Sequence, residues 1–351
     1  LAEAVRCEQC PPEMRIPRLR EIAQVSLERL DDAQAALDAW REILDSVGDD
    51  PESLAGMDQV LSQQNRWEEL YPVLAQRADV LPEGDVRNGV LRRLADLHRD
   101  RSGDRAAEAA ALAQLWRANP QDDEVSERLV ALRRESGNLV GVVEVLRARA
   151  ERSPPMAAVE RWAELAVALE ASGDQHSAVN AWREVSTRDP VHPHAWEETE
   201  RLLRATGQHA VLYASLVERS EAMGPGPERA SIHARASDAA RAMGDPATAL
   251  AAAKRAVAMD PSNDALATAL MDSLEVLGER DRLLAFVRER SEGLPDGPAR
   301  IELTRRAARA VGQTDPAGAA VVWEEVRAGA RRAGMLDDAE ALDALLGLAE
   351  L

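Results

Sequence analysis

Two short clusters of side chains in this 351-residue chain have types and spacing that could bind a metal ion. Cys7 and Cys10 form one C-x-x-C pair, but a structural zinc site needs a second pair of ligands, and the nearest histidine is the distant His98. His194 and Glu198 are four residues apart and can share one face of a helix. That pair stands at the expected start of a helix, where a polar cap and early glutamates are ordinary. We therefore expect no metal and no other cofactor at either cluster.

Other catalytic signatures are missing from the sequence. Gly224-Pro225-Gly226 is not followed by the Lys-Ser/Thr of a phosphate-binding loop, and neither G-x-S-x-G nor H-E-x-x-H occurs. The net charge of -19 argues against binding to nucleic acid or to an anionic membrane surface. No apolar run approaches the roughly 18 residues of a membrane span. The sequence therefore predicts a protein that is not an enzyme.

The chain repeats itself about every 70 residues, as repeat architectures do. The marker is an arginine near the end of each repeat, at positions 77, 149, 219 and 290, followed five or six residues later by a proline. We predict one continuous array over residues 1–351. Residues 1–10 end a preceding repeat, and the others are repeat 1 (11–81), repeat 2 (82–153), repeat 3 (154–224), repeat 4 (225–294) and a partial repeat 5 (295–351).

Composition indicates that the array is helical. Hydrophobic residues make up 45% of the chain, with one phenylalanine and two tyrosines, so Leu, Ala, Val and Trp must fill the core. Good helix formers dominate, and the residues that favour strands are scarce.

The third repeat shows the pattern most clearly. Its first helix should end at Gly173, which suits the left-handed conformation after a helix, and Asp189-Pro190 should end the second. The residues that should pack the two helices together alternate large and small types: Trp162, Leu165, Ala166, Leu169, Ala178, Trp182 and Val185.

This pattern resembles the tetratricopeptide repeat, in which the first helix carries large, large, small and large residues and the second carries a small residue, a large residue and a closing proline. Only Val185 departs from it in this helix pair. The second half of each repeat is a weaker copy, in which Thr199 and Glu200 replace an apolar and a small residue. The resemblance implies an all-α, right-handed α-solenoid of antiparallel helix pairs with about 20 helices, similar to long arrays of some GC-rich bacteria.

Two segments depart from the pattern. In repeat 2, Arg92, Asp96 and Arg99 fall on core positions, so we expect a one-residue shift that buries Leu91, Leu94 and Leu97 instead. After Trp323 the pattern stops, and Leu336–Leu351 is amphipathic. This last segment is expected to cap the array, with a docking helix for a partner as the alternative.

The seven tryptophans are expected to pack in the core. Five of them occupy packing positions of the repeat, namely Trp40, Trp162, Trp182, Trp196 and Trp323. Trp67 and Trp116 lie off these positions, yet packing is expected for them too.

Binding in the tetratricopeptide family uses the inner face of the first helix of a pair. Carried over to this chain, the resemblance implies partner-binding roles for Glu124, Glu127, Arg134, Glu160, Glu170, His194, Glu197, Arg201, Arg204, Asp238, Arg241 and Asp272. Among these, His194, Arg201, Arg204 and Arg241 would form a basic patch for an acidic peptide or a terminal carboxylate. The alternative is that these charges are solvated and paired with neighbouring glutamates.

We therefore expect a scaffold that binds a peptide or protein partner in a concave groove. One alternative is a structural spacer, or a rod that self-associates through an uncapped N-terminal end. Another is a regulatory array within a larger signalling protein such as a protein kinase.

Overall fold

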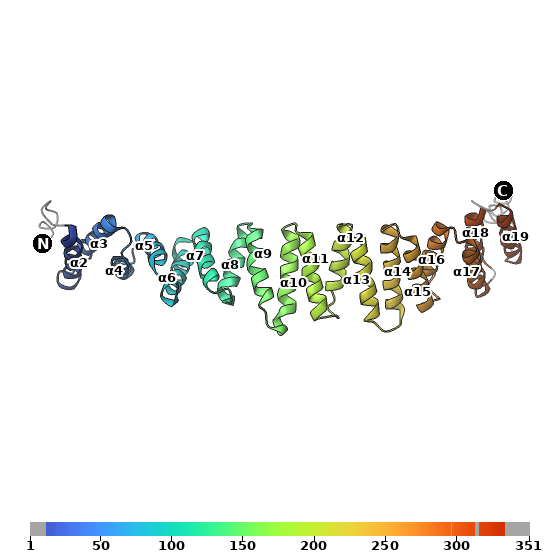
Figure 1. The fold of residues 1–351 in the computed structure, drawn as a ribbon, viewed down its shortest axis with the longest axis horizontal. Coiled ribbons are helices and arrows are strands. Elements are labelled where there is room, and N and C mark those ends of the chain that lie inside the picture. The colour runs from blue at the N-terminus through green and yellow to red at the C-terminus, as the bar shows by residue number, and fades with distance from the viewer. Residues whose placement is uncertain (1–11, 296, 313–315, 334–351) are drawn as a thin grey trace. The chain divides into compact units, whose positions relative to one another are not determined.

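The computed structural model describes residues 12–295, 297–312 and 316–333 (Figure 1). These residues form 18 α-helices and one short π-helical segment, and they contain no strand. The all-α fold class, an array of antiparallel helix pairs, is thereby confirmed. The expected count was about 20, but the helical segments predicted at residues 1–10 and 336–351 lie outside the described residues. The superhelical sense stays a prediction.

Each complete repeat consists of two helix pairs. Repeat 1 contains α2 (Pro12–Arg29), α3 (Ala33–Val47), α4 (Pro51–Gln63) and α5 (Trp67–Val80). Repeat 2 contains α6 (Asp85–Leu97), the π-helical segment η1 (His98–Ser102), α7 (Arg105–Ala118), α8 (Asp123–Glu135) and α9 (Leu139–Glu151). Repeat 3 contains α10 (Pro155–Ala171), α11 (Gln175–Arg188), α12 (Ala195–Ala205) and α13 (His209–Glu221). Repeat 4 contains α14 (Pro227–Ala242), α15 (Pro246–Met259), α16 (Asp264–Leu277) and α17 (Arg280–Glu292), and repeat 5 contains α18 (Pro298–Gly312) and α19 (Pro316–Arg332).

The chain divides into two compact parts, which we call the N-terminal part (residues 1–199) and the C-terminal part (residues 200–351). Within each part, consecutive helices lie beside one another (Figure 1). No described helix has both the length and the hydrophobicity that a membrane crossing demands.

Short caps set the ends of the helices. The side chains of Asp32 and Asp174 accept the backbone N–H of the residue three positions later, at 3.0 Å in each case. Gly173 takes the predicted left-handed conformation with φ of 86°. His192 caps α12, because its Nδ1 accepts the backbone N–H of Ala195 at 3.1 Å. The polar cap expected at this helix start is thus present, and it is supplied by His192, two residues before His194.

The predicted shift in repeat 2 holds for Leu91 and Leu94, whereas the burial expected for Leu97 was wrong. Leu91 and Leu94 are buried, Leu97 is half-buried, and Arg92 and Arg99 are exposed. After these leucines, α6 continues directly into the π-helical segment η1, in which each turn holds one residue more than an α turn.

The expectation for the tryptophans holds for four of the seven: Trp40, Trp116, Trp182 and Trp323 are buried. It was wrong for Trp67, Trp162 and Trp196, which are half-buried. The guanidinium of Arg188 covers the Trp162 ring at 5.3 Å, and Trp196 Nε1 donates to the carbonyl of Pro190 at 3.1 Å. Each ring therefore meets a polar group on one side. Trp67 is also half-buried, with the guanidinium of Arg101 5.4 Å from its ring.

Gly56 should be intolerant of a side chain. A Cβ at this position in α4 would overlap the ring of Trp40 in the neighbouring helix α3. We expect Gly56→Ala to lower the free energy of unfolding by about 1–3 kcal/mol through overpacking. The matched control is Gly89→Ala in α6, where nothing lies within 4 Å of an added Cβ. Because alanine stabilises a helix interior relative to glycine, the control should leave stability unchanged or raise it in chemical denaturation. Equal losses in the two variants would contradict this packing.

Candidate partner-binding site

Several of the residues that sequence predicts for binding form ion pairs with neighbouring helices in the N-terminal part. Glu127 Oε1 accepts from Arg149 Nη2 at 2.9 Å, and Arg134 Nη2 donates to Glu164 Oε1 at 2.9 Å. Glu124 Oε2 lies 3.9 Å from Arg92 Nη1. Of the other predicted residues of this part, Glu170 is half-buried and interacts within the chain. Glu160, His194 and Glu197 are exposed, and His194 Nδ1 lies 3.8 Å from Glu197 Oε2.

Ion pairs also engage the predicted residues of the C-terminal part. Arg204 Nη2 donates to Glu200 Oε1 at 2.6 Å, and Arg241 Nη2 lies 3.5 Å from Asp238 Oδ1. The exposed Arg201 interacts within the chain as well. The binding roles of these residues stay a prediction.

Asp272 belongs to a further ion-paired cluster of the C-terminal part. It pairs with Arg306, whose Nε also donates to Glu275 Oε1 at 2.9 Å. Burial alone would lower the pKa of Arg306, but its hydrogen bonds to Glu275 and Asp272 raise that pKa above its ordinary value. This cluster joins α16 to α18, so Asp272 has a structural partner.

In repeats 1, 2 and 4, the arginine that marks the end of the repeat links its helix to the preceding one. Arg77 on α5 pairs with Asp58 on α4, and Arg290 on α17 donates to Asp264 Oδ1 on α16 at 2.5 Å. Arg149 on α9 makes the corresponding contact with α8 through Glu127. The most regular polar feature of the sequence therefore stabilises the array.

Two buried acids, Asp58 and Glu200, bind two arginines each. The side chain of Asp58 is 5% exposed and accepts from Arg93 Nη1 at 2.7 Å in addition to pairing with Arg77. Glu200 is 7% exposed and accepts from Arg204 and Arg235 at 2.6 Å each. The repeat pattern alone marks Glu200 as a departure, whereas in the structure Glu200 joins α12 to α14.

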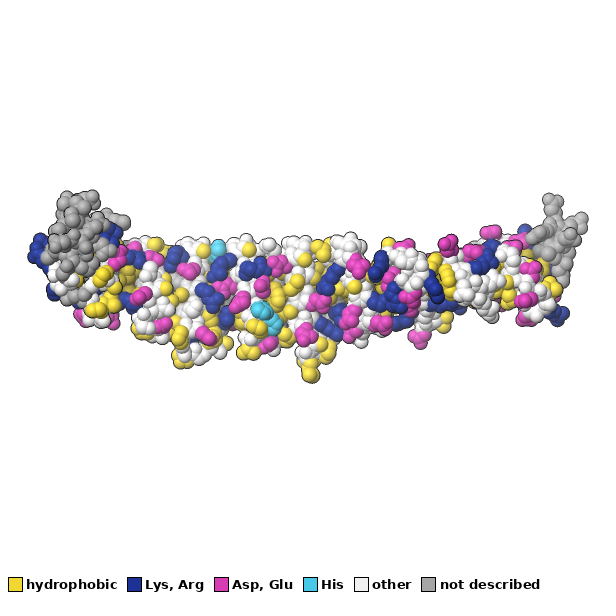
Figure 2. Space-filling model, turned by 180° about the vertical axis from the view of Figure 1, so that it is seen from behind, with side chains coloured by type: hydrophobic (Ala, Val, Ile, Leu, Met, Phe, Trp, Pro, Cys, Tyr) yellow, Lys and Arg dark blue, Asp and Glu magenta, His cyan; other side chains and the backbone are white. Residues whose placement is uncertain are grey.

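The surface charge is accordingly mixed. On the face drawn in Figure 2, acidic and basic side chains are interspersed along the described residues. A field of one sign, which would attract an oppositely charged macromolecule over a long distance, is not visible on that face.

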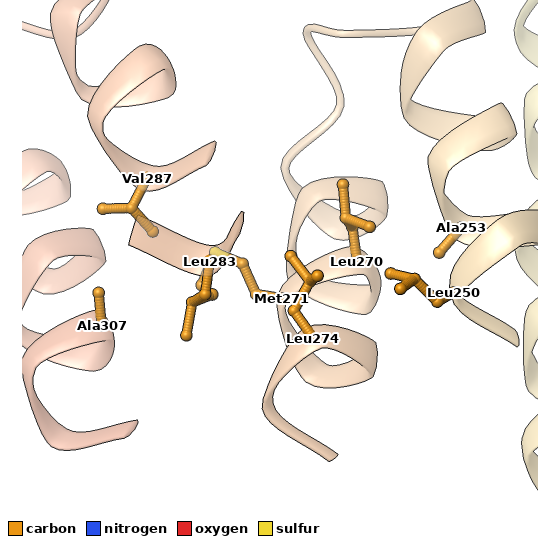
Figure 3. Packing of buried hydrophobic residues seen from close by; sticks show 8 residues of the cluster. All are labelled: Leu250, Ala253, Leu270, Met271, Leu274, Leu283, Val287 and Ala307. Carbon is orange, nitrogen blue, oxygen red and sulfur yellow. The ribbon is translucent and has the colours of Figure 1, made fainter. Parts of the chain in front are cut away.

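A large apolar groove lies in the C-terminal part, between α15 and α17 and above α16. Its volume is about 920 Å³, which is within the range of ligand pockets. Its floor is the outer side of a buried cluster in which Leu270 and Leu274 of α16 lie between side chains of α15 and α17 (Figure 3). The half-buried Val257, Phe286 and Leu294 extend the apolar surface to the groove walls.

Charged side chains surround this floor. Lys254, past the middle of α15, and Arg282, in the first turn of α17, contribute one cation each, and Glu289 lies two turns of α17 beyond Arg282. Asp264 at the rim is neutralised by Arg290, as described above. The groove thus has an apolar floor and a rim to which α15 and α17 each contribute a cation.

Sequence reasoning missed this groove, although a signal was present. Lys254 is the only lysine of the chain and Phe286 the only phenylalanine, and both line the groove. The repeat pattern directed attention to the first helix of each pair, whereas these two residues are on second helices.

A second, smaller pocket lies in the N-terminal part. Its volume is about 400 Å³, and it lies beside Trp67, Arg92, Arg93, Asp96 and Arg101. Arg92 and Arg93 are bonded to Asp122 and Asp58, at 2.6 and 2.7 Å, so most of its charge is already paired. In the described ranges, no three His, Cys, Asp or Glu side chains gather as a metal site would require. Cys7 and Cys10 lie outside those ranges.

Neither a family model nor a curated protein matches the chain. Solved structures with similar folds include a chain of the Naa15/Naa10 complex bound to HypK-THB, with 13% identity over 96% of this chain and 55% of that one (TM-score 0.36). TTC0263, a tetratricopeptide repeat protein of Thermus thermophilus, has 19% identity over 53% of this chain and 98% of its own length (TM-score 0.25). YrrB, a tetratricopeptide repeat protein with an unusual peptide-binding site, has 12% identity over 53% of this chain and 92% of its own (TM-score 0.27). This chain therefore spans about half the length of the first of these proteins.

The class of protein follows from the chain's own repeats. Antiparallel helix pairs recur along it with small residues where helices cross, left-handed glycines between helices and a regular terminal arginine. The chain is an all-α repeat protein whose helix pairs resemble the tetratricopeptide repeat.

Proposed function

We propose that this protein is a non-enzymatic interaction scaffold and that the groove between α15 and α17 binds a segment of a protein partner. The groove itself is the observation that carries the proposal. Its apolar floor is large enough for several side chains of a peptide segment, and its charged groups lie only at the rim. Its lining residues include neither histidine nor cysteine. The charged residues of the rim would orient the bound segment and select its sequence, and burial of its apolar side chains on the floor would provide the affinity.

The face predicted from the sequence, around Arg201, Arg204 and Arg241, is a second proposed contact area. Charge reversal there is a poor test of binding, because Arg204 neutralises the buried Glu200. Its loss would destabilise the fold as well as any complex.

Site-specific crosslinking tests the groove directly. A photo-reactive amino acid at Glu289, an exposed lining residue, should capture a partner that the same probe at Val276 does not. Val276 is the matched control, because it lies on α16 and is 65% exposed but does not line the groove. Ala285→Trp should abolish the crosslink, since the exposed Ala285 lines the groove and an indole there would fill it without opening a cavity in the core.

A crosslink that is equally strong from both positions, or one that survives Ala285→Trp, would contradict binding in the groove. A chain that captures only itself would favour the spacer or self-associating rod.

A further inference from the structure

We infer that the partner segment carries a carboxylate that binds between Lys254 and Arg282, followed by apolar side chains that lie on the floor of the groove. The inference rests on the proposed function and deepens it by naming the chemistry of the occupant. It comes from a comparison of repeat 4 with repeat 1, where the chain itself supplies the corresponding carboxylate.

The two repeats can be aligned through the caps of their helices. Asp32 caps α3 and Asp245 caps α15, each by accepting a backbone N–H at 3.0 Å. With these caps superposed, Lys254 corresponds to Arg41. In the same way, α5 begins after Arg66 and α17 after Glu279, so Arg282 corresponds to Glu69.

In repeat 1, a carboxylate bridges the second helices of the two pairs, α3 and α5. Glu69 Oε2 on α5 accepts from Arg41 Nη2 on α3 at 2.6 Å. Arg66 holds the same carboxylate through Nε and Nη2 at 2.6 and 2.7 Å. The hydrogen bond from Arg66, together with the charges of Arg66 and Arg41, holds the pKa of Glu69 below its ordinary value.

In repeat 4 the local pair is inverted. The acid is now Glu279 and the base is Arg282, and Glu279 Oε1 lies 3.2 Å from Arg282 Nη1. As a result, the two positions that are bridged in repeat 1, Arg41 and Glu69, are both occupied by cations in repeat 4, namely Lys254 and Arg282. Within the described part of the chain, Lys254 forms no ion pair.

Repeats 2 and 3 do not share this arrangement. The position that corresponds to Arg282 is Gly141 in repeat 2 and Val211 in repeat 3, so neither presents a pair of cations. In repeat 2, moreover, the buried Trp116 stands at the position of Val257. Among repeats 1 to 4, whose helices the structure describes, repeat 4 is therefore the one that combines two cations with this apolar groove.

An acidic partner group satisfies both features. A carboxylate between an ammonium and a guanidinium forms charge-assisted hydrogen bonds and relieves the repulsion between the two cations. Apolar side chains that follow it would cover Val257, Phe286 and Leu294 and remove their surfaces from water. A basic partner segment is disfavoured beside Lys254 and Arg282, because like charges repel.

A charge-swapped variant isolates this interaction. Glu279→Arg combined with Arg282→Glu keeps the net charge and the local pair, but places a carboxylate of the chain opposite Lys254, as Glu69 is placed opposite Arg41. The probe is a displayed library of short random peptides selected on the parent protein. Selected peptides are then synthesised with a fluorophore and titrated against the parent, the swapped variant and Ala285→Trp.

We expect peptides that lose affinity with Ala285→Trp to combine bulky apolar residues with Asp or Glu. Replacing that acid with its amide, or using the swapped variant, should weaken binding at least about tenfold. Unchanged melting temperatures of the two variants verify that they are folded.

The two possible failures are distinguishable. Peptides that need the open groove but are basic, or that are indifferent to the swap, would overturn the carboxylate while leaving the groove as the binding site. If no selected peptide is sensitive to Ala285→Trp, both the carboxylate and the groove are wrong.

Discussion

Trp182→Ala is expected to lower the free energy of unfolding by about 3–5 kcal/mol, because it removes a buried indole and leaves a cavity. Trp182 is 6% exposed and lies on α11, which packs on the buried Leu165, Ala166 and Leu169 of α10. Since each helix pair of a repeat array depends on its nearest neighbours, amide protection should fall first in α10 and α11. Hydrogen exchange with chemical denaturation measures both effects.

Trp162→Ala is the matched control for this prediction. It removes the same side chain from the same helix pair, but the Trp162 ring is half-buried and covered by Arg188 on one side. Loss of the Trp162 ring should therefore lower the free energy of unfolding clearly less than loss of the Trp182 ring. Equal destabilisation by the two variants, or a uniform loss of protection along the whole chain, would contradict the assignment of Trp182 as the core residue of this pair.

Asp58→Ala should destabilise the N-terminal part by about 2–3 kcal/mol, because it leaves Arg77 and Arg93 without their shared buried carboxylate. The figure is below that of a fully buried pair, because the side chains of Arg77 and Arg93 are 22% and 42% exposed and reach solvent. Denaturant titration measures the loss.

Glu325→Ala provides the surface comparison for that prediction. Glu325 pairs with Arg288 at 3.1 Å, and both side chains are about half exposed. Its removal should cost less than about 1 kcal/mol. If Asp58→Ala proved no more costly than Glu325→Ala, the buried acids would not be the links that hold neighbouring helices together.

The helices were predictable because local chemistry decides them. Gly173 and the residues around Pro190 predicted where α10 and α11 end, and the apolar spacing of Leu91 and Leu94 predicted the shift in repeat 2. Each signal depends on residues within one or two turns of a helix.

The surface was less predictable, because it depends on side chains that are far apart in the sequence. Glu200 looked unsuited to a helix interface until α14 supplied Arg235, 35 residues later. The groove arises because Val257 and Phe286, on two different helices, leave space above α16 that neither fills. Periodicity reports which residues face a neighbouring helix, but it does not report how well their volumes fill the space between helices.

The binding site is tested most directly by comparing photo-crosslinks from three positions on the parent protein: Glu289 in the groove, Val276 beside it and Arg201 on the face predicted from the sequence. The account predicts that a partner is captured from Glu289 and that Ala285→Trp abolishes this product. Capture from Arg201 alone, unaffected by Ala285→Trp, would contradict it and place binding on the first helices of the pairs.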